Sequence, residues 1–214
     1  MKKLLVIAAV LGAVAPLAAQ AESNLVNGTG ALSASAKLNF SITVPKVLFL
    51  QVGTGTSNAN NATVDNISFA VPGGGVGNGT AVAGTGGDLT AGAVTVRVLG
   101  NNGTVTLVSG VSGPLSTGVA GNPTVPWSDI TVASGALAST TPGFVNTGIA
   151  HPAFNLAAGG GASTTGTTLT ATGGLVRQEG KWTFAYANTA TLPAGTYGNT
   201  AGNNGVVTYT ATMP

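Results

Sequence analysis

The sequence predicts an all-β protein built as a single antiparallel β-sandwich, preceded by a signal-peptide helix. Three observations predict this fold class. Helical periodicity is nearly absent after residue 21, whereas alternation of apolar and polar residues recurs along the remaining chain. The alternating stretches are short and are separated by Gly, Asn and Pro, as in a sandwich or a barrel. Their connections are too short to contain crossover helices, so paired strands are expected to run antiparallel.

Residues 1–21 have the pattern of a signal peptide. Lys2 and Lys3 precede an apolar run at residues 4–14, and residues 19–21 (Ala-Gln-Ala) offer the small side chains of a signal-peptidase site. The alternative, a membrane anchor, is disfavoured because the run is shorter than the ~20 residues of a transmembrane helix. We therefore expect cleavage before Glu22 and no membrane span afterwards. The mature protein would cross the periplasm of a bacterium and stay at the cell surface or outside it.

The first alternating stretch, ALSASAKLNFSITV at residues 31–44, is unusually long. Strands typically have about 5–6 residues, and this pattern lasts more than twice as long. Its second half carries bulky apolar side chains, whereas Ala34 and Ala36 in the first half are small. This change predicts that residues 37–44 form a core strand, so that the sandwich domain covers residues 37–214.

The preceding residues 22–36 are then either an N-terminal extension or a first strand segment. An extension could pair with the open sheet edge of a neighbouring subunit, through main-chain hydrogen bonds and a few side-chain anchors. The candidate pairing residues are Leu25, Leu32, Ala34 and Ala36. The alternative is that residues 31–44 form one long edge strand that completes the chain's own sandwich.

The other predicted strands follow at short intervals along the chain. They are residues 46–53, 63–71, 92–99, 104–109, 128–134, 167–176, 181–187 and 205–213. Asn102-Gly103 predicts a two-residue hairpin that sets Val98 opposite Leu107. A further hairpin is expected at residues 178–180 (Gln-Glu-Gly), where it would join the two strands on either side.

Two of these strands show which side chains should face the core. On the strand 181–187, Trp182, Phe184 and Tyr186 share one face, which we interpret as core; a sugar-stacking platform is the alternative. On the closing strand, the inward residues are predicted to be Val207, Tyr209, Ala211 and Met213, and the outward residues Thr208, Thr210 and Thr212.

The composition excludes several kinds of partner and favours assembly. After the signal peptide, five basic residues are balanced by five acidic residues, so no basic surface for nucleic acid is expected. Charged residues make up 6% of the chain, against about 25–35% on ordinary soluble surfaces. Copies of such a protein repel each other weakly, which suits a subunit of an assembly. The absence of cysteine means that the core must hold the fold without disulfides.

Residues able to carry out chemistry are scarce. A single histidine, His151, and no cysteine leave no set of metal ligands. A Ser-His-Asp arrangement would need His151 with Asp129 or Asp65, but no nucleophile elbow accompanies them. We therefore predict no catalytic residues, no cofactor, no metal and no enzymatic activity. A secreted enzyme with carboxylates that meet only in the folded chain is the third-ranked alternative.

The two ends of the chain resemble secreted bacterial fimbrial subunits. The C-terminal stretch LPAGTYGNTAGNNGVVTYTATMP is similar to their closing strands, in which an AGTY-like turn leads into a final alternating, Thr-rich strand. The alternating segment that follows the signal peptide resembles the same group, the pilin-like subunits of the chaperone–usher kind. This resemblance implies an immunoglobulin-like sandwich, with a jelly-roll-like one as the alternative. It also implies self-assembly into surface fibres, with a periplasmic chaperone and an outer-membrane usher as further partners.

The leading functional hypothesis is therefore a structural subunit of a bacterial surface filament or pilus, assembled through β-strand pairing between copies. The alternative is a self-contained, secreted or surface-exposed binding domain of the adhesin kind. In that case Trp127 and Trp182 are the candidate aromatic residues that face a ligand.

Overall fold

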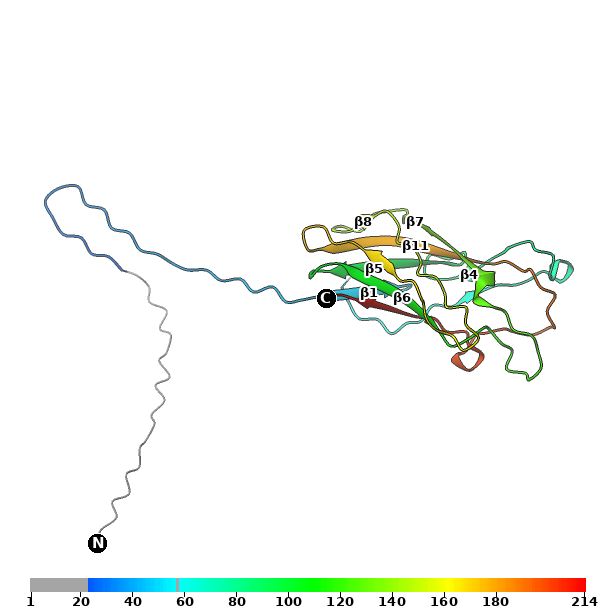
Figure 1. Cartoon of the computed structure of the whole chain (residues 1–214). Helices are drawn as coiled ribbons and strands as arrows, with labels where there is room; N and C mark the ends of the chain where they lie inside the picture. Colours follow the sequence, from blue (N-terminus) through cyan, green and yellow to red (C-terminus); the bar gives the residue numbers. More distant parts are fainter. Residues whose placement is uncertain (1–22, 57) are drawn as a thin grey trace, which may run out of the picture. The chain divides into compact units, whose positions relative to one another are not determined.

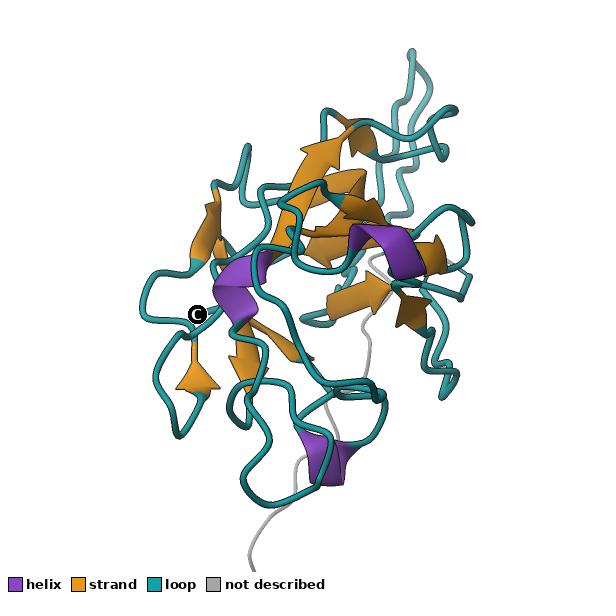
Figure 2. Ribbon diagram, turned by 90° about the vertical axis from the view of Figure 1, so that its right-hand side faces the viewer, coloured by secondary structure: helices purple, strands orange, loops and turns teal. Residues whose placement is uncertain are grey.

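The computed structural model describes residues 23–56 and 58–214 and confirms an all-β protein. The predicted signal peptide lies outside the described residues. The chain divides into two units, Met1–Val44 and Pro45–Pro214, and the second holds every assigned strand. Figure 2 shows these strands together with short helical turns. The turns are the three-residue 3-10 helices η1 (Gly73–Gly75), η2 (Trp127–Asp129) and η3 (Ala201–Asn203). No helix in the described part of the chain is long and apolar enough to span a membrane.

The larger sheet is centred on β11 (Val176–Tyr186), the longest strand (Figure 1). On one side β11 pairs antiparallel with β5 (Ala93–Gly100) and, near its end, with β3 (Val82–Ala83). On the other side it pairs with β7 (Ile130–Gly135) and with the short parallel strand β8 (Val145–Asn146). Strand β1 (Leu48–Val52) pairs with β5 and forms an outer edge.

The smaller sheet is centred on β6 (Val105–Val111). One neighbour of β6 is the closing strand β12 (Thr208–Thr212), and the other side is taken by β10 (Thr167–Leu169) and β9 (Gly161–Ala162). A separate two-stranded pair joins β2 (Ile67–Ser68) to β4 (Thr85–Gly86).

The two larger sheets pack face to face around a continuous apolar core, which makes the domain a β-sandwich. Alternate residues of β5, β6 and β11 point inward, and Val96, Leu107 and Trp182 are all 0% exposed. Burying each such side chain stabilises the fold by about 1.5–3 kcal/mol. A second cluster around Trp127, Ile130 and Tyr186 continues the core toward one end of the domain.

The predicted orientation of two strands is confirmed. Tyr209, Ala211 and Met213 pack on the first core cluster and Val207 on the second, whereas Thr208, Thr210 and Thr212 are exposed. Trp182, Phe184 and Tyr186 likewise belong to the core.

The predicted hairpin at Asn102-Gly103 is wrong. Strand β5 belongs to the larger sheet and β6 to the smaller one, so Val98 pairs with Leu50 and Gln178 rather than with Leu107. Gly103 has a positive φ of 100°, but Asn102 is not among the residues with positive φ, as a type I′ turn would require. The turn is a corner between the two sheets. Both strands still bury their apolar faces, which is why their pattern agreed with a hairpin.

The predicted hairpin at residues 178–180 is also wrong, because β11 runs straight through this stretch. Its pairing with β5 is unbroken from Val176 opposite Gly100 to Thr183 opposite Ala93. Gly180 is needed for close packing and not for a turn: a Cβ there would lie 2.5 Å from Cα of Gly148. The reversal before β11 occurs instead at Gly173 and Gly174, which have φ of 60° and 80°.

The structure also differs from the predicted start of the domain. No strand is assigned within residues 23–44, and the compact domain begins at Pro45 instead of residue 37. Phe40 and Ile42, expected in the core, are 86% and 89% exposed. The physical reason is that a strand needs a paired neighbour, and residues 37–44 pair with no other described residue. We call residues 23–44 the extension.

Candidate functional site

The main concave feature of the described domain is a groove of about 1320 Å³ that lies between the edges of the two sheets. Its first wall consists of β1 and the following segment, residues 54–71. Its second wall consists of residues 192–207 and the start of β12. The floor is formed by core residues, among them Trp127, Phe154, Phe184 and Tyr186. The groove therefore opens onto the hydrophobic core itself.

Both walls end in unpaired strand edges. Among the described strands β1 pairs only with β5, and β12 pairs only with β6. The outer side of each strand therefore has main-chain N–H and C=O groups without a strand partner. Such an edge is a template for another strand. The groove thus combines main-chain hydrogen-bonding groups at its rim with an apolar floor.

The strands β1 and β12 also contact each other directly. Outside the groove lining, Leu48 and Met213 converge on Gly100, where a Cβ would lie 3.7 Å from Cδ1 of Leu48 and 3.0 Å from Sδ of Met213. Lys46 Nζ also donates a 2.6 Å hydrogen bond to the Pro214 carbonyl, next to the start of β1 (Figure 1). The groove itself is bounded by residues 61–71 and 192–207.

The floor of the groove contains a buried polar atom that has no partner among the described residues. Tyr186 is 6% exposed, and no group in the described chain hydrogen-bonds its hydroxyl oxygen. Burial, followed by the nearby Asp129 and Tyr197, raises the pKa of Tyr186 above its usual value. The phenol therefore stays neutral and keeps a hydrogen to donate. Buried polar atoms without a partner are rare in native proteins.

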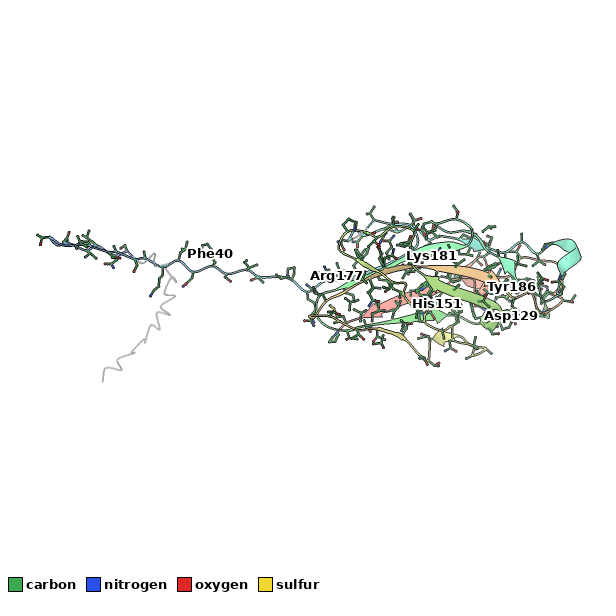
Figure 3. All side chains as sticks on the ribbon, turned by 90° about the horizontal axis from the view of Figure 1, so that it is seen from above. Phe40, Asp129, His151, Arg177, Lys181 and Tyr186 are labelled. Atoms are coloured by element: carbon green, nitrogen blue, oxygen red, sulfur yellow. The ribbon has the colours of Figure 1, made fainter. Side chains whose placement is uncertain are left out.

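One wall of the groove is tied to the core by His151. The Nε2 atom of His151 lies 2.8 Å from the hydroxyl oxygen of Tyr209, and the imidazole packs edge-on against Trp182 and Phe154 with ring centroids 4.6 Å apart in each case. Burial among these rings lowers the pKa of His151 from 6.5 to about 4. The histidine is thus a neutral core residue at pH 7. Figure 3 shows it in the middle of the domain.

A buried ion pair lies on the opposite face of the larger sheet. Arg97 Nε donates a 2.7 Å hydrogen bond to Glu179 Oε2, and Glu179 is 0% exposed. The Thr141 main-chain N–H donates to Glu179 Oε1 at 2.6 Å, and Gln51 Oε1 accepts from Arg97. Burial opposes ionisation of Glu179, but the bonds from Arg97 and Thr141 outweigh it and lower its pKa. This network fixes the loop around Thr141 on the sheet and reaches the groove lining at Gln51.

The extension has the alternation of a strand but no strand partner. Its exposed apolar side chains include Leu25 (84%), Leu32 (51%), Leu38 (71%), Phe40 (86%), Ile42 (89%) and Val44 (73%). Ala34 and Ala36, also candidate pairing residues, are exposed as well. Figure 3 shows the Phe40 side chain on an extended stretch of backbone. A run of this kind is costly to leave in water.

The two candidate ligand-facing tryptophans lie in the interior, contrary to that interpretation. Trp182 is 0% exposed, and its Nε1 donates a 2.6 Å hydrogen bond to the Ile149 carbonyl. Trp127 is 7% exposed at the groove floor, and its Nε1 donates to the Gly113 carbonyl at 2.7 Å. Both indole N–H groups are already used. The physical reason is that large aromatic rings bury the most apolar area in a core without disulfides.

The other residues considered for chemistry do not come together. Asp129 accepts a hydrogen bond from Thr189 and Asp65 from Thr54, and neither carboxylate hydrogen-bonds His151. In the described residues no three His, Asp or Glu side chains are close enough to hold a metal ion. Sequence reasoning missed the groove, because it is defined by the absence of a described strand between β1 and β12.

Comparisons of this chain with protein-family models, with curated proteins and with solved structures found no match.

Proposed function

We propose that this protein is a structural subunit of a bacterial surface filament, whose copies join by strand pairing. In this proposal the extension of one copy lies in the groove of the next copy, between its β1 and β12. The observation that carries the proposal is the groove itself. It exposes the core between two unpaired strand edges, in a chain that also carries an unpaired alternating segment.

The two parts match in chemistry. A strand in the groove would form main-chain hydrogen bonds with an edge and turn every second side chain toward the apolar floor. The extension has this pattern, with Leu32, Leu38, Phe40, Ile42 and Val44 on one side and Ser, Lys, Asn and Thr residues on the other. Each large apolar side chain moved from water into the floor contributes about 1.5–3 kcal/mol. Several together could hold two copies firmly.

The arrangement also leads to fibres. The donated segment and the accepting groove are different surfaces, so each copy can be donor and acceptor at once. Contacts of this heterologous kind form open chains when the rotation between copies does not close a ring. The nearly neutral surface opposes such growth weakly. A subunit with an open groove also needs cover while in transit, which is the role that the fimbrial resemblance assigns to a periplasmic chaperone.

The test uses the full mature chain and a synthetic peptide of residues 31–44. Purified protein should form filaments visible by negative-stain electron microscopy. Excess peptide should occupy free grooves, raise the Tm of the monomer and stop filament growth. The control peptide has the same composition, with its apolar residues grouped so that alternation is lost, and should do neither. Protein that never polymerises, or filaments that grow unchanged at saturating peptide, would contradict the proposal.

A further inference from the structure

The chain contains four Asn-Gly steps, which begin at Asn27, Asn78, Asn102 and Asn204. Such a step can rearrange spontaneously, because the main-chain nitrogen of the glycine can attack the side-chain amide carbon of the asparagine. Glycine has no side chain to obstruct this approach. The attack requires the glycine nitrogen to lose its hydrogen and the asparagine side chain to turn toward it. Hydrogen bonds that hold either group therefore oppose the reaction.

Three of the four glycine N–H groups are held by the folded domain. Each donates a hydrogen bond to a main-chain carbonyl: Gly79 to Asn188 at 2.9 Å, Gly103 to Gly174 at 3.0 Å, and Gly205 to Thr200 at 2.8 Å. An N–H group in such a bond reacts only when the surrounding structure opens.

The asparagine side chains of the same three steps are held as well. Asn78 Oδ1 accepts from the Thr80 N–H at 2.8 Å, Asn102 Nδ2 donates to the Pro214 carbonyl at 2.8 Å, and Asn204 Nδ2 donates to the Pro114 carbonyl at 2.9 Å. Both reacting groups are thus restrained at each of these steps.

The fourth step, Asn27-Gly28, lies in the extension and differs in both respects. Asn27 and Gly28 are exposed, and neither forms a hydrogen bond with another described residue. No strand is assigned within residues 23–44, so no sheet restrains the main chain there. We propose that Asn27 is a self-modification site, at which the folded protein deamidates while its other three Asn-Gly steps stay intact.

The reaction needs only water as a co-reactant. The Gly28 nitrogen forms a bond to Cγ of Asn27, and the bond from Cγ to Nδ2 breaks. Nδ2 leaves as ammonia, with the hydrogen that the Gly28 nitrogen has given up. Water then opens the resulting cyclic imide at either of its two carbonyls, which leaves an aspartyl or an isoaspartyl residue at position 27. No atom is oxidised or reduced.

The product carries a carboxylate where the extension had a neutral amide. Lys37 is the only charged side chain in residues 23–44, so the new carboxylate cancels the charge of the extension. The five basic and five acidic residues of the mature chain cancel each other, so the modified chain becomes net negative. Net charge keeps proteins apart in solution, and modified copies therefore repel each other more than new ones. The inference does not depend on the proposed function.

The test compares the four steps within one protein. The full mature chain is kept folded and dilute at mildly alkaline pH in water enriched in heavy oxygen. Peptide mapping by mass spectrometry then measures the conversion and the incorporated oxygen at each asparagine. A second sample is treated identically in guanidinium chloride, where all four steps are free. In the folded sample Asn27 should convert about tenfold faster or more than each of the other three, whereas the unfolded sample should convert all four at similar rates.

Asn27→Gln is the control variant, because attack on the longer glutamine side chain closes a larger ring and is much slower. Isoelectric focusing of the folded wild type should show a growing acidic band that Asn27→Gln lacks. The inference fails if Asn27 stays intact in the folded protein, or if any of the three held steps converts as fast as Asn27. An acidic band of equal strength in Asn27→Gln would also contradict it, because the reaction would then lie elsewhere in the chain.

Discussion

The Nε2 atom of His151 lies 2.8 Å from the hydroxyl oxygen of Tyr209 and joins the aromatic core to the strand that forms one wall of the groove. The imidazole is surrounded by Phe154, Trp182 and Phe184, so burial holds its pKa at about 4. The only chemical group that hydrogen-bonds this ring within the described chain is the phenol of Tyr209. This contact joins His151 to β12, which carries Tyr209.

Stability should fall as the pH falls from about 6.5 to about 4. In this window the folded His151 stays neutral while the unfolded chain, with a histidine pKa of 6.5, takes up a proton, so lower pH favours unfolding. The loss from this residue is up to about 3 kcal/mol. Denaturant unfolding of the wild type and of His151→Phe at pH 7 and pH 4 measures it. The variant should lose less between the two pH values; equal losses would show that His151 is not the responsible group.

Removing one partner of the buried ion pair should destabilise the domain. Arg97→Ala leaves the Glu179 carboxylate buried without its cation, which typically costs about 3–5 kcal/mol. Arg177→Ala removes an exposed arginine from the same strand as Glu179 and serves as the control. Chemical denaturation should give a large loss for the first variant and less than about 0.5 kcal/mol for the second. Similar small losses for both would mean that the pair is not needed.

Gly180→Ala should also destabilise the domain. The added Cβ would lie 2.5 Å from Cα of Gly148 and 2.8 Å from the Gly135 carbonyl oxygen, and main-chain atoms cannot swing away as a flexible side chain can. The expected cost is about 1–3 kcal/mol. Gly73→Ala is the matched control, because nothing lies within 4 Å of a Cβ there. Thermal unfolding gives the Tm of each variant. Equal Tm values would show that β11 at Gly180 and the segment at Gly148 can move apart without loss of stability.

The strands around Gly180 show which features of the fold the sequence could and could not predict. Alternation located most strands and the inward faces of β11 and β12, because burial on one side of a strand leaves a period of two. Alternation did not reveal which strands pair, because a strand needs an apolar face in either sheet. The prediction therefore paired β5 with β6 in one hairpin, although they belong to different sheets. Residues 178–180 (Gln-Glu-Gly) resembled a turn because their sequence is polar. Glu179 can be buried in a strand only through its ion pair with Arg97, and Arg97 is far away in the sequence. The groove was not predictable, because no residue pattern marks a missing strand.

The inward and outward faces of β12 should respond differently to charge. Ala211 packs on the core and Thr210 is exposed. Ala211→Asp would place a carboxylate against apolar groups and should cost at least about 2 kcal/mol. Thr210→Asp adds the same charge on the solvent side and should change stability little. Equal effects on unfolding midpoints would mean that β12 is not held in the register with β6 that the structure gives.

A single charge in the extension should separate assembly from stability. Phe40 is 86% exposed in the monomer, so Phe40→Asp should leave the Tm of the monomer unchanged. In a filament its ring would lie against an apolar floor, where an unpaired carboxylate is strongly disfavoured. We therefore expect this variant to remain monomeric by light scattering under conditions in which the wild type polymerises. Asn39→Asp adds the same charge at the neighbouring position, on the side that would face solvent, and should still polymerise. Assembly by both variants would mean that the extension does not enter a groove, whereas a lowered monomer Tm in Phe40→Asp alone would mean that Phe40 already packs within its own chain.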